Sequence, residues 1–162
     1  MFIEATHVQY LEAAGARVVP IDYRVTEEEL KRLLENLNGV YIPGDQRILV
    51  SNPRELELPF TKAVQRILHW AQEHNEKEDK HFPVMGVAYG CLAMLRSQMR
   101  DDKYLQDITP SGDLQINLAH KPQHTYIFDE FETEKLENIL DNISFLSSLS
   151  LGISLNDFVK QE

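Results

Sequence analysis

The stretch FPVMGVAYGC, residues 82–91, carries most of the information about the fold. A short apolar run is followed by two glycines that flank Ala88, and a helical pattern then begins. This order of strand, tight turn and helix is typical of a nucleophile elbow, G-x-Nuc-x-G, in which the turn presents one side chain above the sheet. Gly86 and Gly90 keep bulk away from that turn. The central residue is alanine, and its methyl group cannot attack a carbonyl carbon.

The rest of the chain alternates between helical and extended patterns. We predict helices over 3–14 (ended by Gly15), 26–37 (opened by the capping box Thr26-Glu27-Glu28-Glu29), 58–74 and 133–141. We predict strands over 17–21, 40–42, 83–86, 114–118 and 125–128, the elbow strand leading into a helix that runs to about residue 99. Strands joined by crossover helices predict one α/β domain over residues 1–162, with a mostly parallel sheet covered on both faces.

Composition excludes several classes of protein. A net charge of −10 argues against general binding to nucleic acid or to an anionic membrane surface. No stretch reaches the roughly 18 uninterrupted apolar residues of a membrane span, so membrane insertion is not expected. The first residues show neither a basic segment nor an apolar core, so we expect no secretory signal. A single cysteine, Cys91, excludes an intramolecular disulfide and suits a reducing compartment.

No cofactor or metal is predicted. His120 and His124 have the spacing of helical metal ligands, but Pro122 between them argues against a regular helix. Cys91 lies three residues beyond Ala88, most of a helical turn, so we expect a small core residue rather than a replacement nucleophile. Tyr89 is expected to fill space near the turn, and stacking on a ligand is its alternative role.

Taken together, these residues resemble the gamma-glutamyl hydrolase family, a branch of the class I glutamine amidotransferase-like fold. The resemblance is carried by VQYLEAAGARVVPI (8–21), LNGVYIPGD (37–45), FPVMGVAYG (82–90), DITPSGDLQINL (107–118) and GISLNDF (152–158). It implies a flavodoxin-like three-layer α/β sandwich. It also implies hydrolysis of gamma-linked glutamate from folate polyglutamates by a cysteine nucleophile and a histidine base. Members of this family are often lysosomal or secreted, and the compartment of this chain stays unknown.

The chain departs from the family pattern at three places. The elbow pattern G-T-C-L-G becomes Gly86-Val87-Ala88-Tyr89-Gly90, which removes the nucleophile. The oxyanion-loop pattern P-G-G becomes Pro43-Gly44-Asp45, which adds a carboxylate where negative charge would develop. The family's base lies in a later segment, G-V-Q-W-H-P-E, which this sequence does not contain. The catalytic constellation is therefore expected to be degenerate.

The resemblance also implies a strand before residues 1–15 that is missing here, as is the family's C-terminal part. In a flavodoxin-like order this strand lies between the strands predicted at 17–21 and 40–42. Three arrangements are open: the two strands pair directly, another chain donates a strand, or the sequence is incomplete. Strand addition is a known mode of binding, so a protein partner or a homo-oligomer that completes the sheet is expected.

Three hypotheses for function follow. The first is a catalytically inactive gamma-glutamyl hydrolase-like protein that acts as a structural or binding subunit. The second is a truncated or nucleophile-substituted form of an active folate gamma-glutamyl hydrolase. The third is a sensor whose pocket binds a glutamyl or folate ligand, for which no residue of the sequence gives specific support.

Overall fold

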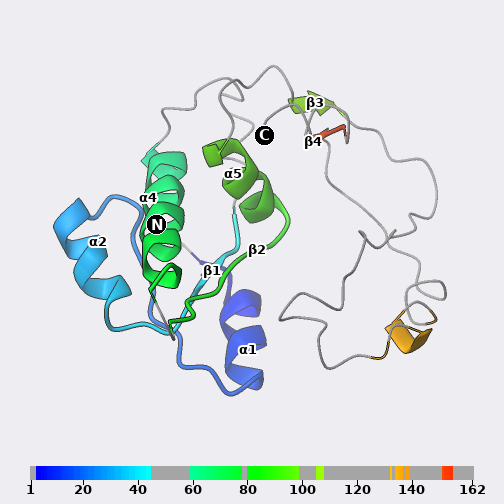
Figure 1. Cartoon of the computed structure of the whole chain (residues 1–162), viewed down its shortest axis with the longest axis horizontal. Helices are drawn as coiled ribbons and strands as arrows, with labels where there is room; N and C mark the ends of the chain where they lie inside the picture. The colour runs from blue at the N-terminus through cyan, green and yellow to red at the C-terminus, as the bar shows by residue number, and fades with distance from the viewer. Residues whose placement is uncertain are drawn as a thin grey trace. The chain divides into compact units, whose positions relative to one another are not determined.

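The computed structural model describes residues 3–44, 59–77, 80–98, 105–107, 132, 134–136, 138 and 151–154 (Figure 1). The chain divides into two compact units, one of residues 1–106 and 153–162 and one of residues 107–152. The first unit contains the helices and strands that build the candidate site, and the following description concerns that unit. Across all the described residues, no helix combines the length and the apolar character that crossing a membrane requires.

Four helices and two strands make up the described part of this unit up to residue 98. The helices are α1 (Ala5–Ala13), α2 (Glu27–Leu34), α4 (Pro59–Asn75) and α5 (Tyr89–Gln98). The strands are β1 (Val40–Ile42) and β2 (Val84–Gly86). Two more strands, β3 (Leu105–Asp107) and β4 (Leu151–Ile153), form a separate two-stranded sheet.

The strands β1 and β2 pair in parallel, with Val40 opposite Val84 and Ile42 opposite Gly86. At one end the Val40 N–H donates to the Pro83 carbonyl at 3.0 Å, and at the other the Val87 N–H donates to the Ile42 carbonyl at 3.0 Å. Parallel strands require a crossover, and α4 lies between them in the chain. The predicted α/β fold with a parallel sheet is confirmed as a flavodoxin-like arrangement with a small sheet.

The core lies between this sheet and the helices α2, α4 and α5. One cluster joins α2 to α4 and is formed by the buried side chains Leu30, Leu34, Ile67, Ala71 and Phe82. A second cluster joins β1, α4 and α5 through Ile42, Val64 and Ala93. The buried positions of α4 recur at helical spacing, so one apolar stripe of the helix faces the core as its sequence predicts.

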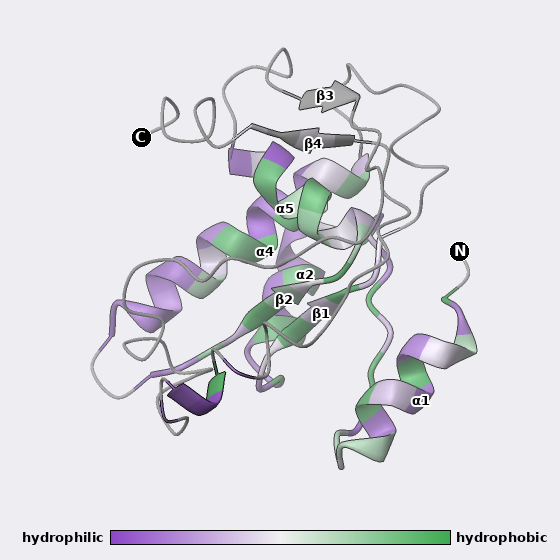
Figure 2. Ribbon diagram, turned by 90° about the vertical axis from the view of Figure 1, so that its right-hand side faces the viewer, coloured by the Kyte–Doolittle hydropathy of each residue, from purple (hydrophilic) through white to green (hydrophobic). Residues whose placement is uncertain are grey.

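The helix α1 lies against the opposite face of β1. Successive side chains of a strand point to opposite faces, so Tyr41 points away from Ile42. Tyr41 packs against His7 and Tyr10 of α1, with ring centroids 5.6 and 6.4 Å apart. Figure 2 shows α1 and α4 on either side of the β1–β2 pair. No residue of α1 is fully buried, so this helix is held less firmly than α4.

Local signals in the sequence set several element ends. The predicted capping box is confirmed: the Glu29 N–H donates to the Thr26 hydroxyl at 3.3 Å, and the Thr26 N–H donates to the Glu29 carboxylate at 3.1 Å. Gly15 follows α1 with φ of 88°, a left-handed conformation that glycine adopts without strain. At the end of α4, Asn75 clasps Phe82: its amide donates to the Phe82 carbonyl at 3.1 Å, and its Oδ1 accepts from the Phe82 N–H at 2.6 Å.

The strand predicted over residues 17–21 is not observed. Among the described residues no neighbouring strand supplies hydrogen-bond partners to this segment, and β propensity alone does not form a ladder. The predicted strands at 114–118 and 125–128 lie outside the described residues. Of the helix predicted at 133–141, the structure describes helical residues at 134–136 and 138.

Candidate functional site

The turn between β2 and α5 has the backbone geometry of an elbow. The strand β2 ends at Gly86, the helix α5 begins at Tyr89, and Ala88 stands between them with φ of 52°. Among the described residues Ala88 is the one residue other than glycine with a positive φ. A residue with a Cβ is strained there by about 1–2 kcal/mol, so the surrounding structure must hold it. The Ala88 side chain is exposed to solvent.

Backbone hydrogen bonds fix the turn to the first turn of α5. The Ala88 carbonyl accepts from the Cys91 and Leu92 N–H groups at 3.1 and 3.4 Å. The Val87 carbonyl accepts from the Gly90 N–H at 2.8 Å. The Tyr89 N–H makes no hydrogen bond with another described residue, as is usual for the first N–H groups of a helix.

Three glycines allow the segments around the turn to approach closely. A Cβ on Gly90 would collide with the Ile42 carbonyl, and a Cβ on Gly44 would collide with the Gly90 N–H. A Cβ on Gly86 would lie 2.8 Å from the Cys91 backbone nitrogen. Glycine fits these three positions because it has no Cβ. The atoms that a Cβ would meet include backbone atoms, which cannot rotate away as a side chain can. The Pro43–Gly44 loop is thus pressed against the start of α5.

This arrangement places the elbow and the Pro43–Gly44 loop at the carboxyl ends of β1 and β2. In open parallel sheets, ligands bind at that edge. At this edge Ala88 presents a methyl group, which cannot act as a nucleophile. Asp45, which departs from the family's P-G-G pattern, lies outside the described residues.

Of the two side chains beyond the turn that carry a sequence-based expectation, Cys91 differs from it. Cys91 is exposed, so the prediction of a core residue is wrong. The buried face of α5 is formed by Gly90, Leu92, Ala93, Arg96 and Ser97, and it leaves Cys91 on the outer side. The Tyr89 hydroxyl is buried and has no hydrogen-bond partner among the described residues. Its ring fills space beside the turn, and stacking on a ligand stays a prediction.

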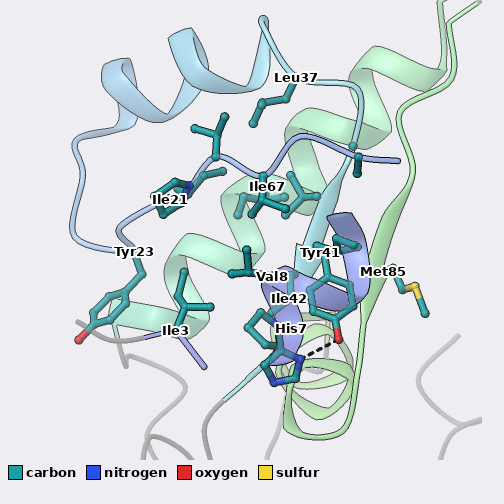
Figure 3. A pocket seen from close by; sticks show the side chains of 18 of the residues that line it. Ile3, His7, Val8, Ile21, Tyr23, Leu37, Tyr41, Ile42, Ile67 and Met85 are labelled. Atoms are coloured by element: carbon teal, nitrogen blue, oxygen red, sulfur yellow. Dashed lines mark hydrogen bonds between the residues drawn. The ribbon is translucent and has the colours of Figure 1, made fainter. Parts of the chain in front are cut away.

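A second feature of the unit is a cavity of about 1140 Å³ beside β1 (Figure 3). Its walls come from α1, from the segment 15–23, from β1 with the Pro43–Gly44 loop, and from α4. Most of the lining side chains are apolar, among them Val8, Ile21, Ile42 and Ile67. Ala88, Tyr89 and Gly90 do not line it. The Pro43–Gly44 loop is shared, since it contacts the elbow on one side and the cavity on the other.

One polar pair stands in this apolar cavity. His7 Nδ1 lies 3.0 Å from the Tyr41 hydroxyl oxygen, joining α1 to β1 (Figure 3). Burial raises the pKa of the Tyr41 hydroxyl, and the nearby Tyr10 adds to the rise. At the rim, the Arg24 guanidinium and the Arg24 N–H bond the Asp22 carboxylate and lower its pKa to about 2.

The described residues contain no group of three His, Cys, Asp or Glu side chains arranged to hold a metal ion. His120 and His124 fall outside those residues. The histidines of α4 contact neighbouring side chains of the same helix. His69 lies 3.5 Å from Glu73, and His74 stacks on Trp70 with ring centroids 4.7 Å apart.

The cavity and its His7–Tyr41 pair were not predicted from the sequence. His7 and Tyr41 are 34 positions apart in the sequence, and a lone histidine in a helical pattern gives no sign of such a contact. The signal that was present is indirect. The family resemblance implies a strand between residues 17–21 and 40–42 that this sequence lacks, so a gap in the sheet is expected there.

Comparison with known proteins supplies independent evidence. No family model matches the chain. It is 27% identical to "Gamma-glutamyl hydrolase" of Mus musculus, covering 99% of this chain and 49% of that protein. It is 34% identical to "Gamma-glutamyl hydrolase 1" of Arabidopsis thaliana, covering 97% and 43%, and 28% identical to "Gamma-glutamyl hydrolase" of Homo sapiens, covering 99% and 48%. The chain thus spans about half the length of the relatives that it matches.

Proposed function

Because the chain belongs to the gamma-glutamyl hydrolase family, we propose that it is a catalytically inactive member that acts as a structural or binding subunit. The observation that carries the proposal is Ala88, whose methyl group stands at the turn between β2 and α5. Acyl transfer needs a nucleophile at that position, and removing the nucleophile of such a site leaves only weak residual catalysis from binding and polarisation.

The one cysteine of the chain does not replace the missing group. Cys91 lies in the first turn of α5, where its N–H bonds the Ala88 carbonyl. Three residues of helix correspond to about 4.5 Å of rise, so its thiol is displaced from the tip of the turn. The Tyr89 N–H, which bonds no other described residue, supports a retained oxyanion position, but polarisation of a carbonyl without an attacking group gives slow turnover.

The test uses the 162-residue chain in molar excess over a folate polyglutamate, with released glutamate as the readout. We expect no release above the rate without protein. Glutamate release at the rate of an enzyme, within the usual range of roughly 1–1000 per second, would overturn the proposal.

A second candidate is a truncated or nucleophile-substituted form of an active folate gamma-glutamyl hydrolase. The observation that favours it is the preserved geometry of the turn, with φ of 52° at Ala88 and close contacts at Gly44 and Gly90. In a chain extended by the family's base segment, this candidate predicts that Ala88→Cys releases glutamate from folate polyglutamate, whereas the inactive-subunit proposal predicts none. Ala88→Ser is the matched control, because a hydroxyl is a much weaker nucleophile than a thiolate without a strong base.

A further inference from the structure

The link between α2 and β1 contains an asparagine followed by a glycine, Asn38-Gly39. Of the eight asparagines in the sequence, Asn38 alone precedes a glycine. Its side chain is exposed, and the residue lies in a bend outside any helix or strand. Neither the Asn38 side chain nor the Gly39 N–H makes a hydrogen bond with another described residue. An exposed carboxamide therefore adjoins a backbone nitrogen that no hydrogen bond holds within the described part of the chain.

Close packing accounts for the glycine at position 39. A Cβ added there would lie 2.9 Å from the Pro83 carbonyl oxygen and 3.0 Å from the Pro83 Cγ. Gly39 is not among the described glycines with a positive φ, so the position needs space rather than a left-handed backbone. The next residue, Val40, donates its N–H to the same Pro83 carbonyl at 3.0 Å. The contact that begins the β1–β2 pair thus requires a glycine directly after Asn38.

We propose that Asn38-Gly39 is a site of spontaneous covalent modification, at which Asn38 is converted to aspartate and isoaspartate through a cyclic imide. The Gly39 backbone nitrogen loses its proton to hydroxide and attacks the Asn38 Cγ. An N–Cγ bond forms, the Cγ–Nδ2 bond breaks, and the leaving nitrogen takes a proton from water and departs as ammonia. One water molecule then opens the ring. Opening at Cγ gives aspartate, and opening at the main-chain carbonyl of residue 38 gives isoaspartate.

The structure favours this reaction at Asn38 over other asparagines that it describes. Ring closure requires Cγ to approach the next backbone nitrogen, and glycine neither obstructs that approach nor restricts the backbone conformation. The Asn36 amide donates to the Arg32 carbonyl at 2.8 Å, and the Asn75 amide is held in its clasp with Phe82. Attack at either of these side chains would break hydrogen bonds, and each is followed by a residue that carries a side chain.

The two products differ in their effect on the chain. Aspartate leaves the course of the main chain unchanged and adds one negative charge to a chain whose net charge is −10. Isoaspartate adds the same charge and also lengthens the main chain by one carbon atom, because the backbone then continues through the side chain. This extra atom lies directly before the close contact of Gly39 with Pro83. Isoaspartate is therefore the product that should disturb the fold.

The disturbance should reach the turn at Ala88. The strand β1 has three residues, so a displacement at Val40 is carried to Ile42 at its other end. The Ile42 carbonyl accepts from the Val87 N–H at 3.0 Å and lies against Gly90. We therefore expect isoaspartate at residue 38 to weaken the β1–β2 pair along its whole length.

The first experiment follows the reaction in the 162-residue chain, incubated at mildly alkaline pH and body temperature and analysed by peptide mass spectrometry. We expect a mass gain of about 1 Da at residue 38, since an amide NH2 is replaced by OH. Labelling with isoaspartyl methyltransferase identifies the isoaspartate fraction. Asn36 and Asn75 are internal controls, and Asn38→Gln is the matched variant, because its side chain would have to close a six-membered ring. No gain at residue 38, or equal gains at Asn36 and Asn75, would overturn the proposal.

A second measurement tests whether the fold leaves the site unprotected. The rate at residue 38 in the folded chain is compared with the rate in the synthetic peptide LENLNGVYIP, which has the sequence of residues 34–43. We expect the two rates to agree within about tenfold, because an exposed side chain without hydrogen bonds gains little protection from folding. A larger reduction in the folded chain would overturn the proposal.

Hydrogen exchange tests the expected consequence. The isoaspartate form, separated by chromatography, should exchange the Val40 and Val87 N–H groups about tenfold faster or more than the unaltered chain, and the Glu29 N–H of α2 at an unchanged rate. The Asn38→Asp variant, which carries the charge without the extra backbone atom, should match the unaltered chain. Unchanged exchange at Val40 and Val87 in the isoaspartate form would refute the coupling to β1. These readouts do not involve glutamate release, so they stand apart from the test of catalytic inactivity.

Discussion

Tyr41 and His7 are joined by a hydrogen bond of 3.0 Å that connects β1 to α1 across the wall of the cavity. The helix α1 contributes no fully buried side chain, so this contact and the ring packing around it carry much of its attachment. The pair therefore decides how firmly one wall of the cavity is held.

Replacing Tyr41 by phenylalanine should loosen α1. The change removes one hydroxyl and keeps the ring, so we expect a loss of about 1 kcal/mol in the free energy of unfolding, measured with urea. Tyr10→Phe is the matched control, because Tyr10 is 62% exposed and its hydroxyl has no hydrogen bond with a described residue. Equal losses in the two variants would contradict the role of the His7–Tyr41 bond.

The same hydroxyl predicts an effect of alkaline pH. Burial raises the pKa of Tyr41 above its ordinary value of 10.0, so the fold favours the neutral form. This contribution to stability is complete below pH 10.0 and is lost as the pH rises through the raised pKa. Urea unfolding followed between pH 9 and pH 11 should therefore show a smaller decline for Tyr41→Phe than for the unaltered chain.

The capping box at the start of α2 should be measurable. Thr26→Ala removes the oxygen that accepts from the Glu29 N–H, and we expect a loss of about 1 kcal/mol in the free energy of unfolding. Thr26→Ser keeps that oxygen and should cost much less. The hydrogen bonds from Thr26 lower the pKa of Glu29, so their contribution is lost as the pH falls through this lowered pKa.

Replacing Gly90 or Gly15 by alanine should lower the free energy of unfolding for different reasons. Gly90→Ala drives a methyl group into the Ile42 carbonyl, and we expect a loss of about 2 kcal/mol or more in thermal or urea unfolding. Gly15→Ala meets no atom within 4 Å, so the strain of its positive φ, about 1 kcal/mol, is the expected cost. A Gly90→Ala variant as stable as the unaltered chain would contradict the close approach of β1 and α5.

Replacing Ala88 by glycine should stabilise the fold. The residue is exposed and strained, so Ala88→Gly loses little packing and should gain up to about 1 kcal/mol in the free energy of unfolding. Ala88→Val should lose stability, because a β-branched residue tolerates a positive φ poorly. If glycine destabilised the chain more than valine did, the left-handed turn at this residue would be refuted.

The parts of the fold that the sequence predicted well depend on local chemistry. The capping box, the stripe of α4 and the strand–glycine–helix order around Ala88 each follow from neighbouring residues, and the structure contains all three. The strand at 17–21 was predicted wrongly because a strand exists only with a partner. Its residues have the propensity, but no strand lies beside them in the part of the chain that the structure describes.

The exposure of Cys91 was missed for a different reason. The helix α5 reads YGCLAMLRSQ, in which small and apolar residues are spread around the axis, so the sequence does not indicate which side faces the core. The structure buries Arg96 and Ser97 on the side of Leu92 and leaves Cys91 outside. Tertiary contacts determine which face of α5 is buried, and the hydrophobicity pattern alone does not.

The clasp of Asn75 on Phe82 has a practical consequence. Both hydrogen-bonding positions of the Phe82 backbone are tied to the end of α4, so the entry to β2 is anchored independently of the residues that connect them. A reporter peptide or new chain ends introduced at about residue 77 would leave α4 and β2 in register, since insertion is tolerated best where the neighbouring elements hold themselves in place. This connection is the place to engineer probes of the protein without disturbing its turn at Ala88.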